Sequence, residues 1–360
     1  MEVSSRFGSS GKLFIKIAAV YLFISFTLFF PATVQSEERE PADSLFRIIF
    51  YNVENLFDIV NDPFKADDDF TPEGARRWTS YRLRHKVNNI YKALAAAGGW
   101  EIPAIIGLCE VENMNVLEMI TRGTGFNNFG YRIIHRNSAD HRGIDVAVLF
   151  HPGLFTLLDS GFTAISFPFD TLTGTRDIVY LKGTGGPGDT LHFFVNHWPS
   201  RWGGQAETEI YRTYTASVLR SLTDSVLQTN PYANIIIMGD FNDEPHDPSL
   251  KQYLGAGFDY NNPESGKLYN ISHVNKMKRE GTIKFQGEWF LFDQFIVSGT
   301  LLDGTARMQT CPFSVKVFSA GFLLVPDEHW FGCKPFRTYE GFRYTGGFSD
   351  HLPVVLDLYW

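Results

Sequence analysis

Short apolar stretches of strand length recur along almost the whole chain, and no other feature limits its possible folds as strongly. Two longer amphipathic segments, at 80–98 and 205–227, have apolar residues at helical spacing. The strands outnumber the helices and do not alternate strictly with them, so a doubly wound parallel sheet is disfavoured. We therefore expect an α/β protein of packed sheets with helices outside. The predicted strands cover residues 45–51, 104–109, 131–135, 145–150, 178–181, 191–196, 234–238, 290–297 and 352–358.

The composition favours one large folded unit. Of the 360 residues, 44% are hydrophobic and 20% are charged, which excludes a disordered chain and a small disulfide-stapled one. No repeat, low-complexity tract or internal boundary divides the sequence beyond residue 44. The sequence thus predicts a short polar linker at 37–44 and a single domain at 45–360.

The first 36 residues are organised like a secretory signal peptide. Three basic residues precede the apolar run at 17–30, and Val34 and Ser36 occupy the −3 and −1 positions of a cleavage site. The run is shorter than a comfortable membrane span, although an uncleaved anchor is the alternative. We expect a signal peptide at 1–36, cleavage near Ser36 and a secreted or periplasmic protein.

The chain is acidic, with a formal net charge of −8. Without residues 1–36 it has 29 Lys and Arg against 39 Asp and Glu. Such a surface does not attract polyanions, so nucleic-acid binding would require a local basic patch or bound cations.

The three cysteines cannot all pair, and none has a CxxC spacing, so a zinc framework is excluded. Cys311 and Cys333 flank one aromatic segment and could form a disulfide in an oxidising compartment. Cys109 lies inside an apolar strand pattern.

Polar residues cluster at the ends of the predicted strands, where a rigid scaffold can present them to a shared rim. Carboxylate and carboxamide oxygens suit a hard cation such as Mg²⁺, and imidazoles beside such an ion suit attack of water on a phosphoester. Taken singly, each residue could instead cap a helix, close a turn or form a structural ion pair. Asp293 is the most informative, because a carboxylate within an apolar strand needs a partner such as an imidazole. The strand-end residues are Asn52, Glu54, Glu110, His197, Asp240, Asn242, Asp350 and His351.

A series of motifs in a fixed order resembles the endonuclease/exonuclease/phosphatase superfamily. The similarity covers nearly all of 45–360 and implies a four-layer α/β/β/α sandwich of two mostly antiparallel sheets with outer helices. It implies phosphoester hydrolysis more firmly than any one substrate. The motifs are IIFYNVENLFD, GLCEVEN, HRGIDVAVLF, VNHWPSRWGG, IIIMGDFNDEP, GEWFLFDQF and GGFSDHLPVVL.

The resemblance also implies a metal site. Glu110 is similar to the principal ligand of Mg²⁺, with Mn²⁺ as the other possible ion. Asn52, Glu54 and Asp350 are similar to residues that complete the site or orient its waters.

The remaining motif residues resemble the catalytic groups. Asp240 is similar to the group that activates water, and Asn242 to one that holds a phosphate oxygen. His351 resembles the imidazole that stabilises the transition state, oriented by Asp293. His197 resembles a second imidazole, for which Asp145 is the predicted carboxylate partner.

Arginine and aromatic residues around these motifs are the predicted substrate-binding residues. They suit stacked bases, but they could also hold a sugar phosphate or a lipid headgroup, or pack beneath a loop. We expect a secreted Mg²⁺-dependent nuclease or phosphodiesterase with no stable protein partner. The alternatives are a phosphomonoesterase, a lipid phosphodiesterase and an inactive binding module. The predicted substrate-binding residues are Arg142, Arg201, Arg337, Tyr339 and Arg343.

Two further segments bear on these alternatives. The acidic run at 67–69 is expected to be an exposed loop, although it could bind a cation. A lipid enzyme should expose an apolar hairpin, but the segment at 321–326 is better explained as a buried strand.

Overall fold

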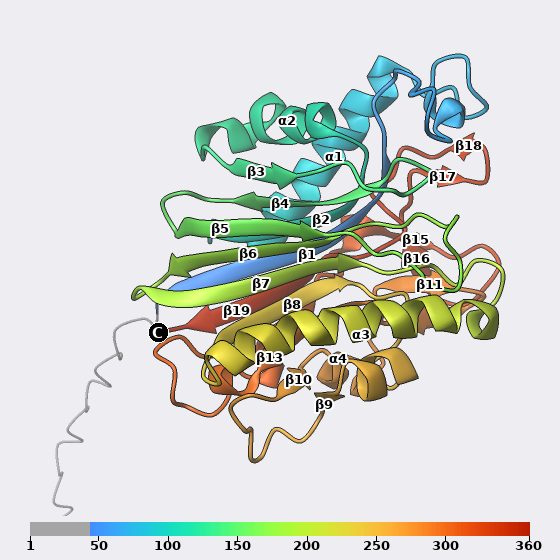
Figure 1. Ribbon diagram of the computed structural model, residues 1–360. Helices are drawn as coiled ribbons and strands as arrows, with labels where there is room; N and C mark the ends of the chain where they lie inside the picture. Colours follow the sequence, from blue (N-terminus) through green and yellow to red (C-terminus); the bar gives the residue numbers. More distant parts are fainter. Residues whose placement is uncertain (1–43) are drawn as a thin grey trace, which may run out of the picture. The chain divides into compact units, whose positions relative to one another are not determined.

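A computed structural model describes residues 44–360 (Figure 1). The predicted signal peptide and all of the predicted linker except Ser44 lie outside the described residues. Among residues 44–360, no helix is long and apolar enough to cross a membrane.

Two large sheets form the centre of the fold. Most neighbouring strands are antiparallel, and the pairs β1–β2, β7–β8 and β9–β10 are parallel. The first sheet has the order β14 (Val315–Val317), β19 (Val354–Tyr359), β1 (Leu45–Leu56), β2 (Ile105–Val111), β4 (Asp145–Phe150) and β3 (Arg132–His135). The second has the order β5 (Phe155–Thr163), β6 (Ile178–Gly185), β7 (Asp189–His197), β8 (Asn234–Asp240), β13 (Asp293–Ser298), β10 (Leu268–Asn270) and β9 (Ala256–Gly257).

Helices cover the outer faces of both sheets (Figure 1). Helices α1 (Ser80–Gly98) and α2 (Met114–Gly123) pack on the first sheet, and α3 (Gln205–Thr229) packs on the second. Thr79 caps α1 by accepting a hydrogen bond from the backbone N–H of Arg82. The predicted sandwich of two mostly antiparallel sheets with outer helices is confirmed.

The remaining elements are short. Besides several single 3₁₀ or π turns, they are helix α4 (His273–Met277) and three two-stranded hairpins: β11 (Ile283–Phe285) with β12 (Glu288–Phe290), β15 (Leu324–Pro326) with β16 (Cys333–Pro335), and β17 (Tyr339–Glu340) with β18 (Arg343–Tyr344).

The hydrophobic core between the sheets consists of side chains from alternate positions of each strand. Gly107 lies in this layer, and a Cβ there would come within 2.9–3.0 Å of Phe50, Val195 and Met238. A glycine at this position therefore lets the two sheets approach closely.

Two local predictions are wrong. Segment 321–326 is a short 3₁₀ turn followed by β15, and Phe322 is 46% exposed. The strand predicted at 290–297 begins only at Asp293, and Phe290 belongs instead to the separate strand β12.

The disulfide that the sequence left open is not formed, because Cys311 and Cys333 are both free and exposed. Cys311 precedes a 3₁₀ turn, where its Sγ lies 3.2 Å from Ser314 Oγ, whereas Cys333 opens the separate strand β16.

Candidate active site

Five strands each place one inward-facing residue at the same edge of the layer between the sheets. In β1, Ile48 and Phe50 face the inter-sheet core, and Asn52 is the next position on the same side. The period of two therefore explains why strands that are otherwise apolar converge on a polar cluster. The corresponding residues of the other strands are Cys109 (β2), His197 (β7), Asp240 (β8) and Asp293 (β13).

Asp240 lies at the centre of this cluster. It pairs in the ladder with His197 on one side and with Asp293 on the other. Its Oδ2 accepts a hydrogen bond from Asn52 Nδ2 (3.0 Å), and its Oδ1 accepts one from the backbone N–H of Asn242 (3.0 Å). The carboxylate is therefore fixed from both sheets.

His351 reaches the cluster from the loop before β19. Its Nδ1 lies 2.6 Å from Asp293 Oδ2, and its Nε2 lies 3.8 Å from Asp240 Oδ2. Burial disfavours the imidazolium, but the carboxylates of Asp293 and Asp240 outweigh burial and hold the pKa of His351 well above its usual value. Burial and the charge of Asp293 raise the pKa of Asp240, although His351 opposes them. The Asp293–His351 pair has the arrangement expected of a cationic imidazole held by a carboxylate.

His197 has the opposite electrostatic setting. Its Nε2 lies 3.7 Å from Asp240 Oδ2 and 4.0 Å from Glu110 Oε1, and its buried Nδ1 has no hydrogen-bond partner. Burial and the charges of Arg176 and Arg142 hold the pKa of His197 well below its usual value. The cluster thus contains one neutral and one cationic imidazole, a combination that suits acid–base chemistry.

The prediction that Asp145 is the partner of His197 is wrong. Asp145 accepts hydrogen bonds from His135 Nε2 (3.1 Å) and from the backbone N–H of Ser138 (2.8 Å). In β4 it shares its face with Ala147 on the outer side of the first sheet, whereas the site lies on the inner side.

The backbone is strained where the strands meet the site. Glu54, Asn55, Glu110 and Asn242 all have positive φ, between 50° and 63°. The β1–β2 and β2–β4 registers shift at the same place. Left-handed backbone at non-glycine residues costs about 1–3 kcal/mol each, so the surrounding fold must hold these side chains in place.

Glu110 and its neighbours have the donor chemistry of a hard-cation site. Glu110 Oε2 accepts a hydrogen bond from the backbone N–H of Asn55 (2.9 Å), which leaves Oε1 toward the cluster. Arg337 pairs with Asp350 and Glu54, and the charges of these two carboxylates and of Glu110 raise the pKa of its guanidinium. Oxygen donors with an excess of negative charge fit Mg²⁺ or Mn²⁺.

Both carboxylate oxygens of Glu54 accept hydrogen bonds from protein groups, whereas the resemblance implied that Glu54 completes the metal site or orients its waters. Its Oε1 accepts a hydrogen bond from Arg337 Nε (3.1 Å), its Oε2 accepts one from the backbone N–H of Thr338 (2.7 Å), and Lys86 Nζ lies 3.7 Å away. Arg337 also donates to Asp350 (3.0 Å). Glu54 and Arg337 thus hold the loop before His351 against the end of β1.

Lys86 is a buried cation that sequence reasoning missed. It donates to Thr338 Oγ1 and to the carbonyl of Phe348 (2.6 Å), so α1 anchors the two loops beside the site. The sequence feature that could have revealed it is a lysine between Leu83 and Ile90 on the apolar face of a predicted helix. Cys109 was missed as a site residue for a similar reason, since it was interpreted as an apolar strand residue.

The predicted substrate-binding residues have different environments. Arg142 lies close enough to affect the pKa of His197, and Arg343 is exposed beside Glu340. Arg201 is held by the carbonyl of Asn242 (2.7 Å) and pairs with two aspartates.

Tyr339 is buried, and its hydroxyl donates to the carbonyl of Arg76 (3.0 Å). Stacking of Tyr339 on a base is therefore contradicted, because its ring packs against Phe70 and Trp78.

The acidic run is only partly exposed, contrary to expectation. Asp67 is buried and accepts a hydrogen bond from the backbone N–H of Asp62 (3.0 Å). This bond ties the loop to itself, while Asp68 remains exposed.

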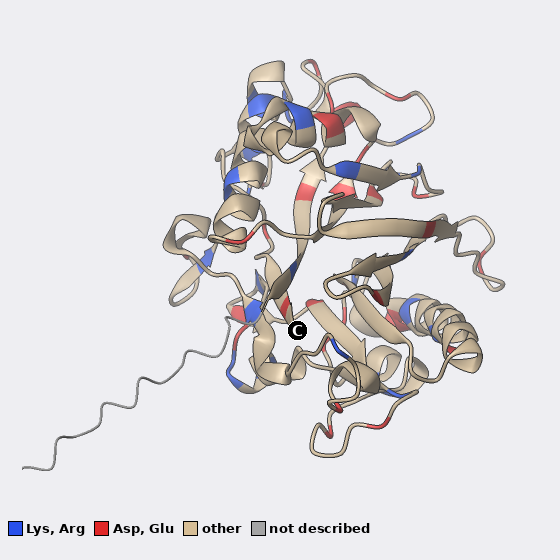
Figure 2. Cartoon of the chain, turned by 90° about the vertical axis from the view of Figure 1, so that its left-hand side faces the viewer, with Lys and Arg blue, Asp and Glu red and all other residues tan. Residues whose placement is uncertain are grey.

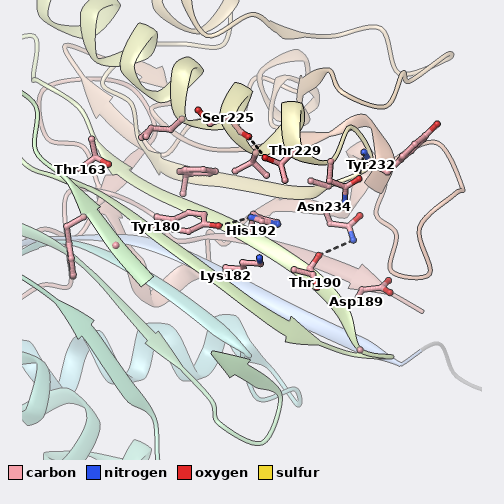
Figure 3. Close-up of a pocket in the computed structure, with 18 of the residues that line it drawn as sticks. Thr163, Tyr180, Lys182, Asp189, Thr190, His192, Ser225, Thr229, Tyr232 and Asn234 are labelled. Atoms are coloured by element: carbon pink, nitrogen blue, oxygen red, sulfur yellow. Dashed lines mark hydrogen bonds between the residues drawn. The ribbon is translucent and has the colours of Figure 1, made fainter. Parts of the chain in front are cut away.

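Two cavities differ in their relation to this chemistry. One of about 230 Å³ adjoins the cluster and is lined by Glu54, Arg76, Arg337 and Tyr339, among others. A larger one, of about 890 Å³, lies between the outer face of β5–β7 and the C-terminal part of α3, where Tyr180 and His192 are hydrogen-bonded (Figure 3). The larger cavity is lined by none of the predicted site residues, whereas Glu54, Arg337 and Tyr339 line the smaller one, so the smaller one lies nearer the chemistry.

Comparison with known proteins places the chain in a family. Residues 47–359 match the model of the endonuclease/exonuclease/phosphatase family. No protein of curated function matches the chain in sequence.

Several solved structures share the fold. A humanized zebrafish (D. rerio) TDP2 is 15% identical with a TM-score of 0.53, covering 87% of this chain and 98% of its own. The human Nocturnin catalytic domain is 15% identical with a TM-score of 0.51, covering 88% and 96%. The mannosyl-6-phosphatase of Bacteroides thetaiotaomicron is 16% identical with a TM-score of 0.51, covering 88% and 100%.

The family match and the geometry agree on the class of chemistry. Members of the family are metal-dependent phosphoester hydrolases, and the prediction of an enzyme of this class is confirmed. With 313 consecutive residues matched, the chain belongs to the endonuclease/exonuclease/phosphatase family.

Proposed function

We propose that the protein is a Mg²⁺-dependent nuclease or phosphodiesterase that cleaves its substrate by attack of water on phosphorus. One observation carries the proposal: Asp240 lies between a neutral and a cationic imidazole, 3.7 Å from His197 Nε2 and 3.8 Å from His351 Nε2. No predicted core position has lost its functional group, which argues against an inactive binding module.

Asp240 is the proposed general base. Asn52 and the backbone of Asn242 orient its two oxygens, and its raised pKa suits acceptance of a proton from water. The Asp293 carboxylate binds Nδ1 of His351, so Nε2–H of the imidazolium is available to a phosphate oxygen. Bound Mg²⁺, held by Glu110 with Asp350 and Asn52 nearby, would neutralise charge on the phosphate and the leaving oxygen.

A basic and aromatic surface beside the cluster supports a nucleic-acid substrate. Arg76 lies over the rings of Phe70 (4.9 Å) and Phe342 (5.4 Å), and Arg82 lies over Tyr344 (4.5 Å). All charged residues of α1 are basic, whereas charges of both signs are interspersed elsewhere (Figure 2). This surface is the kind of local patch that an acidic nuclease needs.

Two exposed hairpins support a lipid phosphodiesterase as the second candidate. In the loop between β15 and β16, Trp330 and Phe331 are 52% and 101% exposed, and Phe285 in β11 is 62% exposed. Lys284 Nζ donates to the carbonyl of Phe331 (2.8 Å), so the hairpins are linked. The same strand forms a bridge from Ile283 to His351, which places the aromatic tips on an extension of the site. Exposed aromatics of this kind suit a lipid surface.

A substrate screen tests both candidates. The purified protein is incubated with DNA, RNA, sphingomyelin vesicles, inositol phosphates and mannose 6-phosphate, each with Mg²⁺ or with EDTA. We expect EDTA-sensitive cleavage of DNA or RNA. Cleavage of vesicles alone, with loss of that activity in Trp330→Ala/Phe331→Ala, would replace the nuclease by the lipid enzyme. Hydrolysis of only the phosphomonoesters would establish a phosphatase, and the small cavity beside Arg337 would then be the candidate binding site.

We also propose that the enzyme acts outside the cytoplasm. The support is the basic, apolar and small-residue pattern of 1–36. The exported protein is expected to begin at Glu37, which N-terminal sequencing of the mature form would reveal. An intact N-terminus in the cell-associated membrane fraction would instead establish an uncleaved anchor.

A further inference from the structure

The thiol of Cys109 lies beside two groups of the candidate active site. Cys109, His197 and Asp240 each provide one metal-ligating atom, and the three atoms lie within 4.8 Å of one another. All three residues are buried. Cys109 pairs with Asn52 across β1–β2, and His197 pairs with Asp240 across β7–β8, so the cluster bridges the two sheets.

The donor set differs from that of the oxygen-rich site around Glu110. Thiolate and imidazole ligands prefer Zn²⁺ and other soft or borderline ions, whereas Mg²⁺ prefers oxygen alone. Three protein ligands with one open position are a usual arrangement for zinc outside structural frameworks. The nitrogen of His197 that faces Asp240 is Nε2, which lies 3.7 Å from Asp240 Oδ2.

We propose that Cys109, His197 and Asp240 form a second metal site, which takes Zn²⁺ and inhibits the enzyme when filled. Binding forms a zinc–sulfur bond and releases the thiol proton to solvent, with no change of oxidation state. Inhibition rests on the proposed function, because it follows from withdrawing Asp240 and His197 from the chemistry of the phosphoester. Occupancy of the site does not depend on that function.

Binding is tested with Co²⁺ as a spectroscopic probe. The background is Cys311→Ser/Cys333→Ser, which removes both exposed thiols and leaves Cys109 as the one cysteine. Co²⁺ is expected to produce a near-ultraviolet thiolate charge-transfer band that Zn²⁺ removes stoichiometrically. Adding Cys109→Ala or Cys109→Ser should abolish the band, with circular dichroism confirming that each variant is folded. An absent band in the background protein, or one that persists without Cys109, would overturn the proposal.

A second measurement leaves Cys109 unchanged, so its result does not depend on whether a Cys109 variant folds. X-ray absorption of the zinc-loaded background protein should show one sulfur among the ligands. A shell of nitrogen and oxygen alone would assign zinc to the Glu110 site and overturn the proposal.

The regulatory part is tested by activity at saturating Mg²⁺. Cys109→Ala is expected to require at least about tenfold more Zn²⁺ for half-inhibition, measured relative to its own activity without Zn²⁺, since loss of even an outer-shell partner costs a metal site that much. Equal inhibition of both proteins would reject the regulatory role. If no substrate is cleaved, the proposed function fails, whereas the cobalt band still decides the metal site.

Discussion

Glu110→Gln is expected to lower kcat by about two to three orders of magnitude and to remove most of the response to Mg²⁺. The change keeps the shape of the side chain but removes the anionic oxygen that faces the cluster. Lewis-acid stabilisation by a metal contributes several kcal/mol, and each 1.36 kcal/mol corresponds to tenfold in rate. The measurement is kcat as a function of Mg²⁺ concentration, with isothermal titration of Mg²⁺ into the protein.

Glu112→Gln provides the matched control. Glu112 lies two residues further along, and its Oε2 accepts a hydrogen bond from the backbone N–H of Asp58 rather than facing the cluster. Glu112→Gln should leave the dependence of kcat on Mg²⁺ unchanged. Equal loss in both variants would show that the effect is structural, and full activity of Glu110→Gln at saturating Mg²⁺ would remove Glu110 from the metal site.

The Asp293–His351 pair should behave as a single device. His351→Ala is expected to lower kcat by at least about a hundredfold, the size of a typical general acid–base or electrostatic contribution. Asp293→Asn should reduce activity less, and the double variant should be little worse than His351→Ala, because both remove the same oriented cation. Fully additive losses would show that the 2.6 Å contact is not a functional pair.

The pH profile gives a second readout for the same pair. His351 acts as the protonated form, so activity should fall as pH rises through its pKa. Asp293 is one of the anions that raise this pKa, and Asp293→Asn should therefore move the alkaline limb of the kcat profile to lower pH. If the alkaline limb of the kcat profile stays at the same pH in Asp293→Asn, Asp293 has only a structural role.

Much of the fold could be predicted because its central strands are buried on both faces. The stretches at 145–150 and 234–238 are apolar after their first residues, Asp145 and Asn234, and appear as β4 and β8. Strand β5 was missed, because most of its residues are exposed or half-buried and it has no apolar run. The hairpins at 321–345 were not predicted either, since tertiary contacts rather than periodicity define them.

The sequence predicted which residues form the candidate site better than it predicted the contacts between them. Asp293 stood out as a carboxylate in an apolar strand, and it does contact His351. Asp145 failed because the motif alone does not tell which face of β4 is inward. Arg337 was predicted as a substrate-binding residue from its charge. Its partners Glu54 and Asp350 were not predicted, because they come from distant segments that only the fold brings together.

The position of β19 determines when the site can form. This strand lies between β14 and β1, and Arg47 of β1 pairs with Asp357, 310 residues further along the chain. His351 immediately precedes the same strand. A nascent chain that stops before residue 351 therefore has neither a closed first sheet nor its cationic imidazole, and the long loop must close before these contacts can form. This order of assembly keeps the chain inactive on the ribosome and delays the appearance of activity until synthesis of the domain is complete.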